Sequence, residues 1–244
     1  MLKKSLIWKF IYWARDLRSQ EVFEALKKHC RGDVLDVGGW DFFLTVKKKN
    51  LTYNSWTTLE TSEEKDLELE EENFKFIHGD GCNMQFNDNQ FDLILNIQVL
   101  EHVLEPIKMV NEISRVLKPA GYAIFLIPQT GVIHHTPEHY YNFTRFWITK
   151  VMERARLEII ELKPLGGVWS TIASRMVYFF PQSIQYKGLS TKECKRNFLF
   201  YLLYPLMALY ATISIPLCLL LSCGDLTEEP NNHFVLVRKK IKDE

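Results

Sequence analysis

Short apolar runs recur along residues 33–128, and each is separated from the next by a polar stretch or a helical pattern. The five runs are DVLDVGG, NSWTTLE, FKFIHGD, FDLILNI and YAIFLIP. FDLILNI is apolar almost throughout, which is typical of a strand covered on both faces. Strands interleaved with helices imply right-handed crossovers, so the pattern predicts a doubly wound, mostly parallel α/β sheet. LEIIELKPLGG and NNHFVLVRKK predict a sixth strand and a final strand.

The helix expected between the fourth and fifth strands lies within EPIKMVNEISRVLKPAG, residues 105–121. Pro119 and Gly121 mark its expected end. Its apolar stripe consists of Ile107, Val110, Ile113 and Leu117. A further helix is expected near residues 148–155. A chain of 244 residues is long enough for one α/β domain with attachments.

Polar residues stand at or near the ends of the first four predicted strands: Asp36, Glu60, Asp80 and Asn96. Ligands of parallel sheets bind outside the carboxyl ends of the strands. We therefore expect these four side chains, distant in sequence, to line one crevice.

The first strand runs into Gly38 and Gly39, and Glu60 follows about 20 positions later. In nucleotide-binding folds a glycine turn lets the backbone approach the ligand, and an acidic residue at this spacing accepts hydrogen bonds from ribose hydroxyls. The glycine pair alone is weak evidence, because many tight turns contain one. Glu60 and Asp80 at successive strand ends strengthen the nucleotide interpretation.

With these residues in place, the chain resembles the class I, Rossmann-like S-adenosylmethionine-dependent methyltransferases, in particular the small-molecule methyltransferase-domain group. The resemblance covers roughly residues 30–165. It depends on VLDVGG, LE, HGDG, FDLILNIQVLEHV and EISRVLKPAGYAIFLIP, of which the last two blocks are the most specific. It implies a seven-stranded sheet with an antiparallel last strand and S-adenosylmethionine as the cofactor.

The resemblance also implies a role for each matching position. Asp36, Gly38 and Gly39 would shape the pocket for the methionine half, and Glu60 would bind the ribose hydroxyls. Asp80 would face the adenine amino group. The remaining implied neighbours of the cofactor are Gly81 and Cys82 beside the adenine, and Asn96, Ile97 and Gln98 at the amino-acid end.

Trp40 and Phe42 depart from the glycine-rich loop of that family. A pyrophosphate needs several bare N–H groups and little side-chain bulk, so the two aromatic residues disfavour a dinucleotide such as NAD. They are more compatible with a sulfonium, because a positive charge is attracted to an aromatic face. The alternative is that Trp40 fills the pocket of a degenerate relative.

Candidates for a catalytic base follow the fifth strand, where His134, His135 and His139 lie within six positions of one another. Methyl transfer needs alignment and exclusion of water, and a hydroxyl acceptor also needs a base. His102 is a secondary candidate. The other interpretation is a polar surface loop. No metal is expected, because adjacent histidines on a loop rarely point to one centre and no clear second shell is evident.

Thirty basic residues balance thirty acidic ones, so nucleic acid is not an expected partner. The five scattered cysteines contain no paired C-x-x-C arrangement, which favours a reducing, cytoplasmic location. The basic N-terminus lacks a small-residue cleavage site, so residues 1–29 are interpreted as an amphipathic helix. Its apolar face includes Leu6, Phe10, Trp13 and Leu17. That face is expected to pack on the domain or to contact a membrane interface.

FLFYLLYPLMALYATISIPLCLLLSC, residues 198–223, carries no charge and is long enough to cross a bilayer. Lys187, Lys192, Lys195 and Arg196 precede it. Pro205 and Pro216 are expected to break or kink its helix. Because the last strand must return to the sheet, we expect helices that dip into the cytoplasmic membrane face and return. Packing within the protein and a true span are the alternatives.

The predicted organisation comprises an N-terminal helix in 1–29, a cofactor-binding core in 30–165, an apolar helical insertion in 166–231 and a final strand in 232–244. The predicted function is S-adenosylmethionine-dependent O-methylation of a small-molecule or lipid-linked, membrane-associated acceptor, such as a cell-envelope glycan. The alternative is a non-catalytic membrane adaptor that keeps the fold without the cofactor. The sequence makes no prediction about the oligomeric state.

Overall fold

The computed structural model describes residues 20–62, 67, 69, 71–190 and 195–241. The stripe predicted at Leu6, Phe10, Trp13 and Leu17, and Lys192 of the basic cluster, lie outside the described residues. Of the predicted N-terminal helix, the part that is described forms α2, Gln20–His29, whose Val22 and Leu26 are buried.

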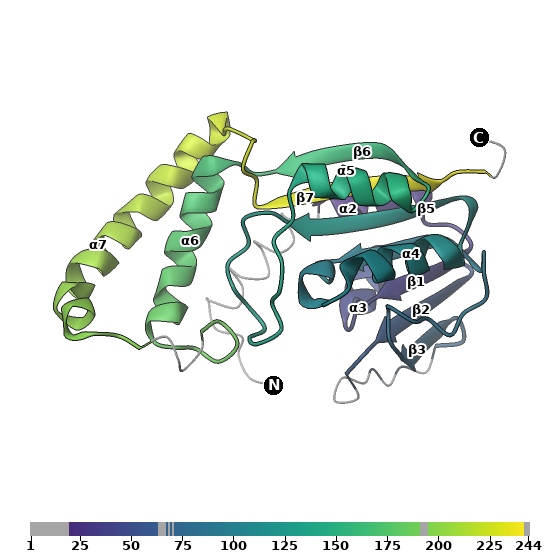
Figure 1. The fold of residues 1–244 in the computed structure, drawn as a ribbon, viewed down its shortest axis with the longest axis horizontal. Helices are drawn as coiled ribbons and strands as arrows, with labels where there is room; N and C mark the ends of the chain where they lie inside the picture. Colours follow the sequence, from purple (N-terminus) through teal and green to yellow (C-terminus); the bar gives the residue numbers. More distant parts are fainter. Residues whose placement is uncertain (1–19, 63–66, 68, 70, 191–194, 242–244) are drawn as a thin grey trace.

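Seven strands form one sheet in the order β3-β2-β1-β4-β5-β7-β6 (Figure 1). The strands are β1 Asp33–Val37, β2 Ser55–Glu60, β3 Phe74–His78, β4 Phe91–Ile97, β5 Leu117–Pro128, β6 Leu157–Leu165 and β7 Asn232–Lys239. Strands β1 to β5 pair in parallel, whereas β7 lies between β5 and β6 and is antiparallel to both. The predicted fold class, a doubly wound sheet with an antiparallel last strand, is confirmed.

Helices cover both faces of the sheet, and each face has its own apolar core. On one face α4 (Pro106–Val116) and α5 (Arg145–Arg154) pack over a cluster that includes Val110, Ile113 and Ile148. On the other face α2 and the short α3 (Phe42–Lys47) cover Phe43, Trp56 and Phe74. The rings of Phe43 and Phe74 stack with their centroids 4.2 Å apart. The near-continuous apolar sequence of β4 follows from this double covering.

The end of α4 differs from the prediction. The helix ends at Val116, and Leu117 has an extended backbone, pairs with Phe91 and begins β5 ahead of Pro119 and Gly121. Ile107, predicted in the buried stripe, is 44% exposed. Met109 is buried in its place beside Val110 and Ile113. Sheet pairing therefore ends the helix earlier than the proline and glycine signals indicated.

The segment between β6 and β7 forms a helical hairpin of α6, Val168–Ser183, and α7, Phe198–Leu221, followed by a short 3₁₀ turn η2, Ser222–Gly224. The two helices lie side by side and project away from the sheet (Figure 1). Of the break or kink predicted at Pro205 and Pro216, the break was wrong, because α7 is one helix of 24 residues with both prolines inside it, and the kink stays a prediction. A proline in a helix interior costs about 3 kcal/mol. The other backbone hydrogen bonds of α7 and its packing on α6 offset that cost.

Candidate functional site

The loop after β1 brings Gly38, Gly39 and the buried Asp36 together. Gly38 has φ +74° and donates its N–H to the carbonyl oxygen of Leu59 over 2.7 Å, so it connects the ends of β1 and β2. A Cβ on Gly39 would lie 1.9 Å from Oδ2 of Asp36. Glycine is therefore required at this position by the carboxylate packed beneath it. Sequence spacing located this turn, and the structure supplies the reason for its second glycine.

Asp36 and Glu60 are both buried at the carboxyl ends of their strands. The pKa of Asp36 is raised from its ordinary 3.8 to about 8, first by burial away from water and then by the neighbouring Glu60 and Asp41 carboxylates, while Trp56 acts in the opposite direction. Glu60 accepts a hydrogen bond from the backbone N–H of Thr61 over 3.0 Å. Two buried carboxyl groups next to a glycine turn provide polar groups that a bound ligand can contact.

The two aromatic residues of the loop have different surroundings. Phe42 is buried in the core with α2, where its ring stacks on that of Phe23 with centroids 5.6 Å apart. Its packing role explains why the loop has an aromatic residue there. Trp40 is in the left-handed region, with φ +39°, and its side chain is 45% exposed.

The remaining predicted cofactor residues follow β3 and β4. Asp80 is exposed, and its Oδ1 accepts a hydrogen bond from the N–H of Cys82 over 2.8 Å. Gly81 is buried against Met109, whose methyl group would lie 2.5 Å from an added Cβ. Asn96 is 1% exposed and directs its amide nitrogen to the Met109 sulfur at 3.5 Å. A cluster of polar groups thus lies along the ends of four adjacent strands.

Asn96 and Gln98 face different neighbours. The Asn96 side-chain oxygen is buried and accepts no hydrogen bond from the residues that the structure describes. Gln98 donates from its side-chain amide to Asn232 at the start of β7, over 3.1 Å. An acceptor such as the Asn96 oxygen is ordinarily satisfied in a folded protein, so it fits a site for a ligand donor such as an ammonium group.

Four histidines predicted as catalytic candidates come together from two segments that are distant in sequence. His102 ends the 3₁₀ turn η1, Leu100–His102, after β4, and the other three belong to the loop after β5. The rings of His102 and His134 lie 4.7 Å apart, and those of His134 and His139 lie 4.8 Å apart. His135 is exposed, with its ring 5.3 Å from that of His102.

Burial lowers the pKa values of three of these histidines, His102, His134 and His139, and so favours their neutral forms. It lowers the pKa of His134 to about 4, and it also holds the pKa values of His102 and His139 below their usual range. Sequence reasoning missed the group beneath them: Glu101 is fully buried, and its Oε1 lies 3.8 Å from Nε2 of His102 and 3.9 Å from Nε2 of His134. The signal was an acidic residue next to His102 at the end of an apolar strand.

A cavity of about 490 Å³ adjoins the two segments that carry these histidines. Leu104 and Ile107 line one side, just after His102, and Tyr141 and Phe143 line the other, just after His139. The Tyr141 hydroxyl donates a hydrogen bond to the Leu104 carbonyl oxygen over 3.1 Å and joins the two segments. The walls of the cavity are largely apolar, as in binding sites for small organic molecules.

The sheet order, the glycine turn and the acidic residues at successive strand ends define a Rossmann-like, class I methyltransferase fold. Residues 35–125 match the model of a family described as "Methyltransferase domain". Residues 35–125 therefore carry a methyltransferase domain of the S-adenosylmethionine-dependent class, whose cofactor is S-adenosylmethionine.

Known relatives and structures agree with this assignment. A probable S-adenosylmethionine-dependent methyltransferase of Mycolicibacterium smegmatis is 26% identical over 164 residues, 61% of this chain and 60% of its own length. A demethylmenaquinone methyltransferase of Staphylococcus saprophyticus is 30% identical over 89 residues, 35% of this chain and 38% of its own length. The matches thus span less than two thirds of these relatives.

A chain in the complex between the Haloferax volcanii Trm112 methyltransferase activator and a methyltransferase has the same fold. Its TM-score is 0.60 with 13% identity, covering 93% of this chain and 92% of that one. The alignment therefore extends the shared fold beyond the segment that matches the family model.

The site residues present fit S-adenosylmethionine. Glu60 ends β2 beside the Gly38 turn, where a carboxylate can accept hydrogen bonds from ribose hydroxyls. The unsatisfied oxygen of Asn96 can accept from an ammonium group, and the half-exposed Trp40 presents an aromatic surface at the loop.

Proposed function

We propose that the protein transfers a methyl group from S-adenosylmethionine to an oxygen atom of a small, membrane-associated acceptor carried on or dissolved in a lipid layer. One observation carries the proposal: three features lie at the same edge of the sheet. They are the apolar hairpin of α6 and α7, the predicted cofactor residues, and the loop after β5 that carries His134, His135 and His139. β6 runs parallel to β5, so α6 leaves the sheet at the same edge as the carboxyl ends of β1 to β5.

Hydrogen bonds connect the hairpin to the loop after β5. The Thr130 hydroxyl lies 3.0 Å from the Thr171 hydroxyl of α6 and donates to the carbonyl oxygen of Pro230 over 3.0 Å. At the far end of the hairpin, the N–H of Thr136 donates to the carbonyl oxygen of Gly188 over 3.3 Å. The loop after β5 is therefore joined by hydrogen bonds near both ends of α6, which supports an acceptor that approaches from that side.

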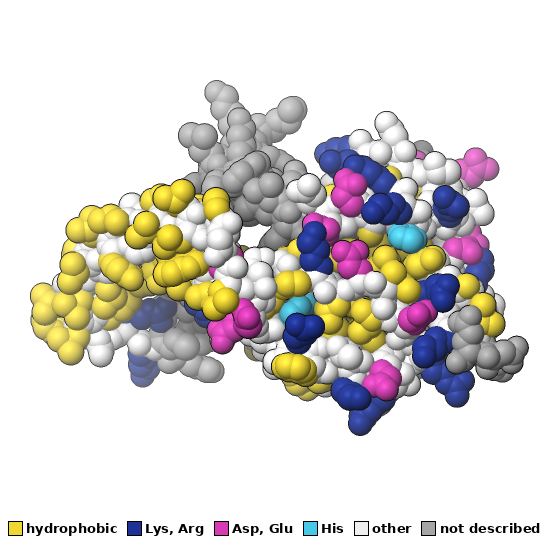
Figure 2. Space-filling view, turned by 90° about the horizontal axis from the view of Figure 1, so that it is seen from above, with side chains coloured by type: hydrophobic (Ala, Val, Ile, Leu, Met, Phe, Trp, Pro, Cys, Tyr) yellow, Lys and Arg dark blue, Asp and Glu magenta, His cyan; other side chains and the backbone are white. Residues whose placement is uncertain are grey.

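The surface of α7 is suited to a lipid environment. Among the described residues it forms the one helix that is long and apolar enough to cross a bilayer, within Phe198–Gly224. Small residues, Ala211, Ser214 and Cys218, are buried on the side facing α6. Leucines such as Leu206 and Leu209 are more than half exposed, and Figure 2 shows hydrophobic side chains covering the hairpin. An exposed apolar surface of this extent is typical of a membrane or partner contact.

The topology favours insertion from one side. Both ends of the hairpin return to the sheet, since β6 precedes it and β7 follows it, and β6 and β7 are paired. A single crossing by α7 would separate these paired strands. Lys187 and Lys195 are exposed near the connection between the helices, where they can meet anionic headgroups. We therefore place the hairpin in the interface on the side of the membrane that carries the domain.

In this function the chain's own residues bind and orient the reactants. When bound, S-adenosylmethionine supplies an electrophilic methyl group. Asp36, Glu60 and Asn96 hold the cofactor against the strand ends, and the apolar cavity beside Tyr141 excludes water from the acceptor. The histidine group is carried by the two segments that line this cavity, and one of its neutral rings would accept the proton of a hydroxyl acceptor.

The first test is calorimetric binding of S-adenosylmethionine and S-adenosylhomocysteine to the detergent-solubilised full chain, with NAD as the control ligand. We expect micromolar binding of the first two and none of NAD. Incubation with methyl-labelled cofactor and a membrane-lipid extract is then expected to place label in the lipid fraction. A folded sample that binds neither cofactor form would favour the adaptor, and in that case Trp40→Gly is expected to create binding.

Replacing either Glu60 or Asp80 by alanine is expected to weaken binding of S-adenosylmethionine by about 1 to 3 kcal/mol each, because each variant removes a hydrogen-bond partner of the ligand. The measurement is calorimetric titration of each variant. The control is Asp88→Ala. This variant removes a carboxylate that forms an ion pair with Arg115 at 2.7 Å and that is not part of the glycine turn. Unchanged affinity in both site variants would refute the assignment of these two residues.

A further inference from the structure

His102 and His134 each have one ring nitrogen fixed by a backbone carbonyl group. Nδ1 of His102 contacts the carbonyl oxygen of Glu138, and Nδ1 of His134 lies 2.9 Å from the carbonyl oxygen of Val132. A carbonyl oxygen only accepts, so both Nδ1 atoms carry the proton and donate it. In the neutral rings both Nε2 atoms then present lone pairs.

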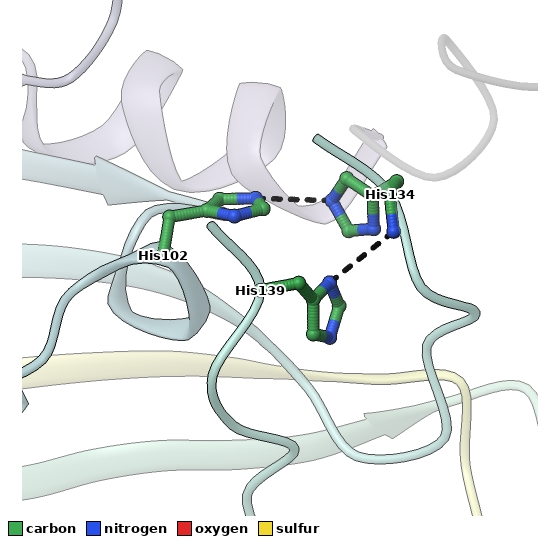
Figure 3. Close-up of side chains that lie close together, drawn as sticks. All are labelled: His102, His134 and His139. Atoms are coloured by element: carbon green, nitrogen blue, oxygen red, sulfur yellow. Dashed lines mark hydrogen bonds between the residues drawn. The ribbon is translucent and has the colours of Figure 1, made fainter. Parts of the chain in front are cut away.

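These two Nε2 atoms face each other at 3.1 Å (Figure 3). Two lone pairs at this separation repel each other unless a cation lies between or beside them. An ion bound tetrahedrally with metal–nitrogen distances of about 2.0 to 2.1 Å separates two ligand nitrogens by about 3.3 to 3.4 Å. The observed separation is close to that value.

His139 and Glu101 complete the surroundings of the pair. One ring nitrogen from each of His102, His134 and His139 lies within 4.8 Å of the other two. Nδ1 of His139 accepts a hydrogen bond from the backbone N–H of His134 over 3.4 Å, and its buried Nε2 atom has no hydrogen-bond partner among the described residues. The buried carboxylate of Glu101, 3.8 Å and 3.9 Å from the two facing nitrogens, supplies negative charge that stabilises a bound cation.

We propose that His102, His134 and His139 bind one divalent transition-metal ion of the zinc type. Three imidazoles are a donor set that such ions prefer, and backbone carbonyls that accept from the opposite ring nitrogen are the usual means of orienting histidine ligands. No metal was expected from the sequence, because neighbouring histidines on a loop rarely converge on one centre and no second shell was evident. The carbonyl oxygens of Glu138 and Val132, and the turn that adds His102, provide both.

An ion held by three imidazoles keeps a coordination position for water or another oxygen ligand. Leu104 and Tyr141, which line the cavity, follow His102 and His139 by two positions in the chain. The inference concerns ion binding alone and does not depend on methyl transfer, so it can fail while the proposed function holds, and the reverse.

The test uses the full chain without a polyhistidine tag, first stripped with a chelator and then titrated with Zn²⁺ or Co²⁺. We expect one ion per chain by elemental analysis, and Co²⁺ is expected to give the visible absorption bands of a low-symmetry site. A stripped, folded protein that takes up no stoichiometric ion would overturn the proposal and would leave a proton shared between His102 and His134 as the explanation of their contact.

Variants separate this site from other histidines. His134→Ala and His102→Gln are each expected to weaken Zn²⁺ binding at least 10-fold and to abolish the Co²⁺ spectrum. His29→Ala, which removes a histidine at the end of α2, is expected to retain both. Circular dichroism checks the fold of every variant. Stoichiometric, unweakened binding by folded His134→Ala and His102→Gln would refute the assignment to these ligands.

Discussion

Glutamate at both Leu206 and Leu209 is expected to release the protein from membranes. These side chains are 65% and 58% exposed on α7, so their replacement leaves the core of the domain unchanged. An interfacial helix binds through its buried apolar face. Two glutamates on that face remove apolar contact and add negative charge that anionic headgroups repel, so membrane binding is expected to be lost. The measurement is co-sedimentation of wild type and variant with vesicles that contain anionic lipid.

The matched control places the same two charges on the sheet domain. Phe146→Glu with Ile160→Glu alters side chains that are 76% and 48% exposed on α5 and β6, and this variant is expected to co-sediment like the wild type. Equal sedimentation of the α7 variant and the wild type would refute membrane insertion of the hairpin. Loss of binding in both variants would show a general charge effect and would also contradict the proposal.

Asp36→Asn is expected to change how the stability of the cofactor-free protein depends on pH. The folded protein holds the pKa of Asp36 at about 8, above its ordinary 3.8, because of burial first and then the Glu60 and Asp41 carboxylates. Between these two values the folded state binds more protons than the unfolded state, so the free energy of unfolding falls as the pH rises. The fall approaches about 1.4 kcal/mol per pH unit, and asparagine removes it.

Urea unfolding between pH 5 and pH 8 measures this effect. The variant is expected to gain stability relative to wild type steadily as the pH increases, although its cofactor binding is weakened. Asp33→Asn removes a partly exposed carboxylate from the same strand and serves as the control. Parallel stability curves for wild type and Asp36→Asn would contradict the buried, protonated state of this carboxyl group.

Much of the fold could be predicted from the sequence, because hydrophobic patterns locate the strands and the ends of the strands locate the polar site residues. FDLILNI forms β4 as expected, and Asp36, Glu60 and Asn96 lie at strand ends because parallel strands share one carboxyl edge. The continuous α7 could not be predicted from local preferences. Pro205 and Pro216 are helix breakers by propensity, and only packing against α6 reveals that the helix continues through them.

The histidine group also combines features that the sequence predicts with features that only the folded structure shows. His134, His135 and His139 are adjacent in sequence and were recognised together, but their relation to His102 depends on the adjacency of β4 and β5. Glu101 escaped recognition because a glutamate next to a histidine at the end of an apolar strand is a weak signal on its own. The orientation of the His102 and His134 rings is determined by the backbone carbonyls of Glu138 and Val132, which leave no trace in residue identities.

The position of β7 has a consequence for the order in which the protein is made. β7 lies inside the sheet, between β5 and β6, but it is the last strand to be synthesised and follows the hairpin. On the ribosome α6 and α7 therefore emerge while the facing edges of β5 and β6 still lack their partner. Exposed strand edges promote aggregation. Early contact of the nascent hairpin with a membrane would keep this incomplete sheet away from other chains until residues 232–239 close it.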